Sequence, residues 1–77
     1  MQKYFRDPIS GLDYSCSECF NYVAVDECGS LFLYEKSPQA RIESGYFSGG
    51  LGSTDLCVVQ RDIDYREWQK TVVKLTI

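Results

Sequence analysis

The residues of this chain that are best able to do chemistry are four cysteines, at positions Cys16, Cys19, Cys28 and Cys57. Cys16 and Cys19 form a C-x-x-C pair, and two intervening residues allow both sulfurs to converge on one metal ion. Such a pair supplies half of a tetrahedral zinc site, and a four-thiolate site needs Cys28 and Cys57 as the other half. A redox role would instead need a thioredoxin-like βαβ setting with a helix N-terminus, and neither is visible in the sequence.

The chain between these cysteines determines whether they can meet. Residues 20–25 predict a strand, residues 26–29 a turn that ends in glycine, and residues 31–36 the returning strand. Extended chain rises about 3.3 Å per residue, so Cys19 and Cys28, at opposite ends of the first strand, lie roughly 20 Å apart. We therefore predict no metal site, with Cys16 and Cys19 as fallback ligands, Cys57 in the core and Cys28 exposed in the turn.

Both faces of this predicted hairpin are apolar, because alternate residues within 22–25 and 31–34 point to opposite sides and both sets are apolar. A strand pair of this kind belongs in the middle of a sheet and is covered from both sides. We expect a C-terminal helix to cover one face and the N-terminal arm, or a second subunit, to cover the other. In that arm, Asp7, Pro8 and Gly11 indicate a turn within a short edge hairpin.

The C-terminal segment predicts an amphipathic helix. Asp64 suits the N-cap, and Glu67 follows three residues later, as in a capping box. One helical stripe is formed by Tyr65, Trp68, Val72 and Leu75. The β-branched residues 71–73 are poor helix formers, so a strand over 71–77 is the competing interpretation. The predicted fold class is α+β, a single domain over residues 1–77 in which a small antiparallel sheet of three to four strands carries one C-terminal helix.

Composition excludes several functional classes. The chain has a net charge of −3, which disfavours binding to nucleic-acid phosphates, and it has no histidine, the commonest general base and metal ligand. We therefore predict no enzymatic activity, no catalytic residues and no cofactor. No apolar run approaches the roughly 20 residues of a membrane span and no signal peptide opens the chain, so we expect a cytoplasmic protein without a membrane partner.

The acidic residues have simple structural interpretations. Asp26 and Glu27 read as a solvated turn, and Asp62, Asp64 and Glu67 as strand-end and helix N-cap residues. Mimicry of DNA phosphates would need segregated negative charge, and eight basic residues are interspersed among the acidic ones.

Residues 37–54 predict a loop-rich region with a brief strand at 46–47, and a third strand follows over 55–61. The best candidate for a contact surface is the glycine-rich loop over residues 44–54. Its "SGYFSGGLGST" lacks the G-K-[ST] ending of a phosphate-binding loop. The eleven aromatic residues are too many for one small core, so we expect some to face a partner. The predicted partner-binding residues are Tyr46, Phe47, Arg41 and Leu51.

The stretch "VAVDECGSLFLYEKSP", a later "GY" pair and the segment "EWQKTVVKL" together resemble small accessory proteins encoded by tailed bacteriophages. The matching residues are Ala24, Asp26, Gly29, Leu31, Tyr34, Pro38, Gly45, Tyr46, Trp68 and Val72. The resemblance implies a protein made in the cytoplasm of an infected bacterial cell. It implies no catalytic residues, and the C-x-x-C pair lies outside the pattern.

The leading functional prediction is a protein that binds a bacterial host protein, such as a defence-system component, and inhibits or redirects it. One alternative is an oligomeric sponge for a signalling nucleotide, with Arg41, Arg61 or Arg66 on the phosphates and Tyr46 or Phe47 stacked on the base. The other alternative is a structural zinc module. Whether the chain forms a homo-oligomer stays open at this point.

Overall fold

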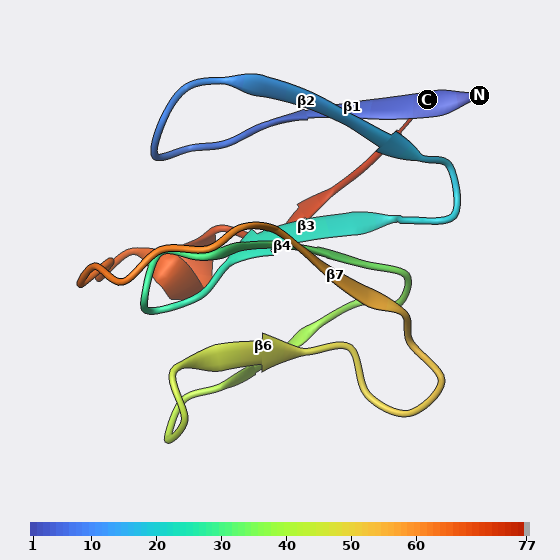
Figure 1. Ribbon diagram of the computed structural model, residues 1–77. Coiled ribbons are helices and arrows are strands. Elements are labelled where there is room, and N and C mark those ends of the chain that lie inside the picture. The colour runs from blue at the N-terminus through green and yellow to red at the C-terminus, as the bar shows by residue number, and fades with distance from the viewer. Residues whose placement is uncertain (77) are drawn as a thin grey trace.

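The computed structural model of the protein describes residues 1–76, which form eight strands in three antiparallel sheets. The first hairpin consists of β1 (Gln2–Arg6) and β2 (Asp13–Ser17). The central sheet has the order β7-β4-β3-β8 and consists of β3 (Tyr22–Val25), β4 (Leu31–Tyr34), β7 (Asp55–Val59) and β8 (Val73–Lys74). The second hairpin consists of β5 (Gln39–Arg41) and β6 (Tyr46–Ser48). The central sheet lies between the two hairpins, which form the outer layers (Figure 1).

The predicted β3–β4 hairpin is confirmed. Val23 pairs with Leu33 across the ladder, and the turn is closed by Asp26, whose N–H donates to Ser30 O at 3.0 Å. Gly29 ends the turn with a φ of 86°, a backbone conformation that glycine adopts without strain. A side chain at Gly29 would also collide with Ile63, since a Cβ would lie 2.5 Å from Ile63 Cγ1.

The first hairpin covers one face of the central sheet, as expected for the N-terminal arm. Its inward-facing Phe5 packs with apolar residues of β3 and β4, and its ring stacks on Tyr14 at a centroid separation of 5.7 Å. The buried core on this face consists of Phe5, Cys16, Phe20, Val23, Val25, Leu31, Leu33 and Leu75. We call this set the upper core.

The other face of the central sheet is covered by the second hairpin and by Trp68, not by a helix. Its buried side chains, which we call the lower core, are Ala24, Tyr34, Phe47 and Trp68. The central strand pair is therefore buried on both faces, as its two apolar faces predict.

The predicted C-terminal helix is wrong, and with it the α+β fold class: among residues 1–76 the protein is mostly β-structure. The segment contains a 3-10 helix of only three residues, η1 (Trp68–Lys70), in which Glu67 occupies the N-cap without a side-chain hydrogen bond. The chain then forms β8, which matches the competing strand interpretation and pairs Val73 with Val23. Asp64 caps no helix. A three-residue helix is also far too short to cross a membrane.

The reason for this outcome lies at the edge of β3. The N–H of Val25 donates to Thr71 Oγ1 at 2.8 Å, so the threonine hydroxyl completes the edge where the two-residue β8 does not reach. A continuous helix over the same residues would leave the β3 edge without these partners. The β-branched residues 71–73 also favour extended chain.

Candidate functional site

The outer face of the second hairpin carries two of the four predicted contact residues. In the β5–β6 register Arg41 lies opposite Tyr46, and Ala40 lies opposite Phe47. Because side chains alternate along a strand and Phe47 faces the lower core, Arg41 and Tyr46 lie together on the solvent side. Tyr46 is 47% exposed. The structure therefore presents a guanidinium and a phenol ring as cross-strand neighbours.

Phe47, a third predicted contact residue, anchors the hairpin instead of facing solvent. It is only 6% exposed, and its ring meets Trp68 edge-on at a centroid distance of 5.3 Å and an angle of 74°. Its backbone N–H donates to Asp26 Oδ1 at 3.0 Å, and its carbonyl oxygen accepts a long hydrogen bond of 3.5 Å from the Tyr34 hydroxyl. These contacts bind the inner side of β6 to the central sheet.

Asp26 is buried, where the sequence predicts a solvated turn residue. Burial raises the pKa of its carboxyl, and the hydrogen bond from Phe47 opposes that rise. Burial also raises the pKa of Tyr34, and the nearby charge of Asp26 adds to the effect, so the hydroxyl stays protonated and able to donate. The position of Asp26 at the start of a hairpin turn predicts its local bond but gives no sign that it holds a strand twenty residues away.

Leu51, the fourth predicted contact residue, is 97% exposed in the loop that joins β6 to β7. Its backbone is fixed by Lys36, whose Nζ donates to Leu51 O at 3.0 Å. In Figure 1 this loop lies at the opposite end of the second hairpin from the turn that follows β5. The structure therefore places Leu51 on the same outer layer as Arg41 and Tyr46 but does not bring it beside them.

The four cysteines do not assemble into a metal site. Cys16 lies in the upper core, whereas the other three are exposed, and all four are free thiols. Cys28 is exposed in the turn, as predicted, but the prediction of Cys57 in the core is wrong. Within residues 1–76 no three cysteine, aspartate or glutamate side chains come together in a way that could hold an ion.

The two cysteines with shifted ionisation favour the neutral thiol. Burial raises the pKa of Cys16, and nearby Lys3 only partly offsets this. Although Cys57 is exposed, partial desolvation of its thiol raises its pKa, and the charge of Asp26 acts in the same direction. Neither group has the lowered pKa of a reactive thiolate.

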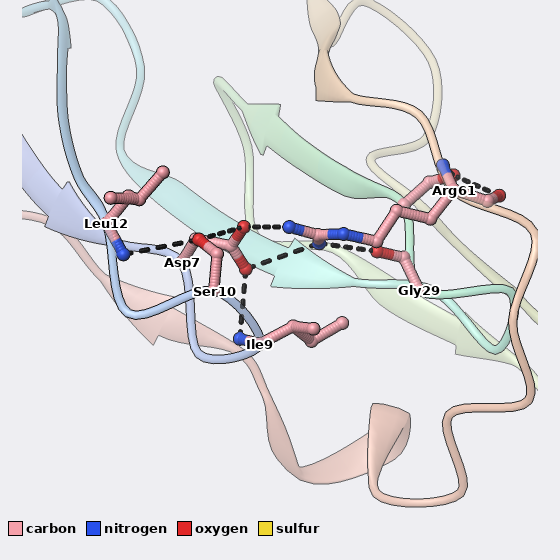
Figure 2. Close-up of polar contacts among 7 residues, drawn as sticks. Asp7, Ile9, Ser10, Leu12, Gly29 and Arg61 are labelled. Atoms are coloured by element: carbon pink, nitrogen blue, oxygen red, sulfur yellow. Dashed lines mark hydrogen bonds and ion pairs between the residues drawn. The ribbon is translucent and has the colours of Figure 1, made fainter.

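Arg61 forms a structural junction with Asp7 and Gly29, which the sequence did not indicate. Its guanidinium forms an ion pair with the fully buried carboxylate of Asp7 and donates to Gly29 O at 2.9 Å, as Figure 2 shows. The same carboxylate accepts hydrogen bonds from Ile9 N–H at 3.0 Å and Ser10 Oγ at 2.9 Å. The junction thus links the turn of the first hairpin, the β3–β4 turn and the chain after β7.

Burial by itself raises the pKa of Asp7, but the hydrogen bonds from Arg61, Ile9 and Ser10 together outweigh that effect and leave the pKa below its ordinary value. Asp7 is therefore ionised at neutral pH and needs the cation beside it. If Arg61 moved away to bind a ligand phosphate, the buried Asp7 carboxylate would be left without a compensating cation, which is strongly unfavourable.

The nucleotide-binding set expected from the sequence is consequently not assembled within one chain. Arg61 is held by Asp7, Phe47 is buried, and Arg66 lies 3.6 Å from Asp64 in an exposed ion pair. Of that set, Arg41 and Tyr46 are cross-strand neighbours.

In comparisons with known proteins, no family model, curated protein or solved structure matches this chain. The resemblance to small phage proteins therefore stays a prediction.

Proposed function

We propose that this protein is a non-catalytic binding protein that attaches to a partner protein through the outer face of the second hairpin. The observation that carries the proposal is the solvent-facing cross-strand pair of Arg41 and Tyr46. Tyrosine and arginine are, with tryptophan, the residue types that dominate the energetics of protein interfaces. Leu51, in the loop at the other end of the hairpin, adds an exposed apolar side chain to the same outer layer.

The anchoring of the hairpin supports the same proposal. Phe47 and Asp26 hold β6 against the central sheet from the inside, so the backbone that carries the outer pair is in place before any partner arrives. Preorganisation lowers the entropic cost of binding and is what an interaction surface on a small domain requires. Because Arg41 and Tyr46 have no role in either core, their side chains are available for a partner.

The resemblance to phage accessory proteins makes a bacterial host protein the expected class of partner, and its inhibition or redirection the expected effect. Arg41 pairs best with a carboxylate on that partner, and the Tyr46 ring with an apolar or aromatic contact.

Affinity capture from a bacterial lysate tests the proposal. The wild-type chain is immobilised beside Arg41→Glu and Tyr46→Ala, and captured proteins are quantified by mass spectrometry. We expect a specific host protein on the wild type and a loss of roughly tenfold or more on either variant, as for interface hot spots. Arg66→Glu is the matched charge control, because Arg66 is 88% exposed and belongs to neither strand of the second hairpin.

Two results would contradict the proposal. The first is capture that neither hairpin variant changes. The second is a nucleotide-sized adduct on the purified protein in native mass spectrometry, which would favour sequestration of a small ligand instead.

A further inference from the structure

A groove runs between the first hairpin and the C-terminal segment. It consists of two adjoining cavities of about 270 and 340 Å³, which share Arg6, Val23 and Val73 as lining residues. The groove exists because β8 has only two residues and pairs with β3 only at Tyr22 and Val23. We call it the β1–β8 groove.

Part of the lining of the β1–β8 groove comes from two strands that each have an open edge. β1 pairs only with β2, and β8 is the last strand of the central sheet, so each presents one edge without a neighbouring strand among residues 1–76. Tyr4 on β1 is 70% exposed and Val73 on β8 is 54% exposed, and both line the groove. An open edge beside exposed apolar side chains suits an extended peptide, which adds as a strand and inserts alternate side chains.

The charge of the groove is opposite to that of the molecule. The chain carries eight basic and eleven acidic residues, yet the groove is lined by three of the basic ones, Arg6, Lys70 and Lys74, and by one acidic one, Glu67. Arg6 pairs with Asp13 and Lys70 with Glu67, but all four side chains are at least 66% exposed. Exposed ion pairs of this kind contribute little and exchange readily for carboxylates of a ligand.

The arrangement of the two adjoining cavities beside open strand edges favours an extended peptide over a compact ligand. Two such cavities in a row fit successive side chains of one extended chain. We infer that the β1–β8 groove binds an acidic, extended peptide segment of a partner protein that inserts apolar side chains.

Titration with short capped peptides tests this inference, with amide chemical shifts of the full-length chain as the readout. The probe is a heptapeptide of alternating glutamate and leucine, compared with one of lysine and leucine and one of glutamate and serine. We expect the glutamate–leucine peptide alone to bind, with shifts at residues 4–6 and 70–75. In Lys70→Glu/Lys74→Glu its affinity should fall about tenfold or more, and the lysine–leucine peptide should now bind.

Arg41→Glu is the control that separates this groove from the second hairpin, because it should reduce host-protein capture about tenfold or more while leaving peptide binding unchanged. The inference is overturned if the glutamate–leucine peptide does not bind, if either comparison peptide binds the wild type equally well, or if the shifts fall on β5 and β6. A single-stranded DNA oligonucleotide that shifts residues 70–75 when the peptide does not would also overturn it, in favour of a nucleic-acid site.

Discussion

At the scale of single residues, the ion pair of Asp7 and Arg61 joins distant parts of the chain. The two residues are 54 positions apart, Asp7 is fully buried, and the Arg61 side chain is 16% exposed. Removing one partner of a buried pair leaves an uncompensated charge in the interior, which costs far more than the pair itself contributes. No local pattern in the sequence could indicate this contact, because each residue alone reads as an ordinary turn or strand-end residue.

We therefore predict that Arg61→Ala lowers the free energy of unfolding by about 3–5 kcal/mol. Domains of this size are stable by only about 4–11 kcal/mol, so the variant should be largely unfolded in mild urea. Arg6→Ala is the matched control. The Arg6–Asp13 pair is exposed on both sides, and its loss should cost about 1 kcal/mol or less. Urea denaturation measures both variants. An equal loss of unfolding free energy in the two would show that the buried pair is no more important to stability than the exposed pair.

Asp26 gives a prediction about pH. Its folded-state pKa is raised by burial, so its ionisation costs stability. The stability associated with the neutral carboxyl is present below the unfolded pKa of about 3.9 and is lost as the pH rises through the folded pKa. Asn at this position stays neutral at every pH and keeps an oxygen for the Phe47 N–H.

Asp26→Asn should therefore be more stable than wild type at pH 7, and the difference should shrink towards zero as the pH falls to about 4. Urea denaturation of both chains across this range measures it. A difference that is independent of pH would mean that the Asp26 charge is not the destabilising feature. Asp7 behaves oppositely, because its lowered pKa gives stability that is present above the unfolded pKa and lost in stronger acid.

At the scale of elements, the sequence predicts the parts whose signals are local. The β3–β4 hairpin combines strand-forming residues with a turn that ends in Gly29, and it forms with its turn where expected. The segment after Asp64 carries two conflicting signals, the helical spacing of its apolar residues and the β-branched residues 71–73, which favour a strand. The competition is decided by the open edge of β3, which is more than forty residues away in sequence and thus invisible to a local pattern.

We predict that the Thr71 hydroxyl is essential for holding this segment along the edge of β3 and not in a helix. Thr71→Val keeps the shape and the β-branched side chain but leaves the Val25 N–H without its acceptor, at a cost of about 1–3 kcal/mol. Thr71→Ser retains the hydroxyl and should lose less. Amide hydrogen exchange at Val25 should accelerate in Thr71→Val and stay slow in Thr71→Ser. Slow exchange in both variants would mean that β8 alone protects the edge.

The candidate contact surface could be predicted only in part, because the pairing that orients its side chains is not visible in a local sequence pattern. Tyr46, Arg41 and Leu51 are exposed in a stretch that reads as surface chain, and their availability follows from composition. Phe47 is adjacent to Tyr46 and equally aromatic, and only the two-residue alternation of β6 assigns one ring to solvent and the other to the lower core. That alternation becomes known once the strand and its register are known.

At the scale of the whole molecule, the protein is a central sheet with a separate core on each side. The upper core joins it to the first hairpin and the lower core to the second. A chain of this length buries a small core, and here that core is divided in two. The lower core is the smaller, with four buried residues, so the second hairpin, which carries the proposed contact surface, depends on few contacts.

This division predicts that the two outer hairpins open independently. Phe5 and Phe47 occupy equivalent places in the upper and lower cores, and each is less than 8% exposed. Phe→Leu at either site should cost about 1 kcal/mol, little enough for the chain to stay folded. In native-state hydrogen exchange, Phe47→Leu should reduce protection in β5 and β6 but not in β1 and β2, and Phe5→Leu should do the reverse. If each variant lowers protection throughout the chain by the same amount, the two cores form one cooperative unit, and the second hairpin is then as rigid as the sheet that supports it.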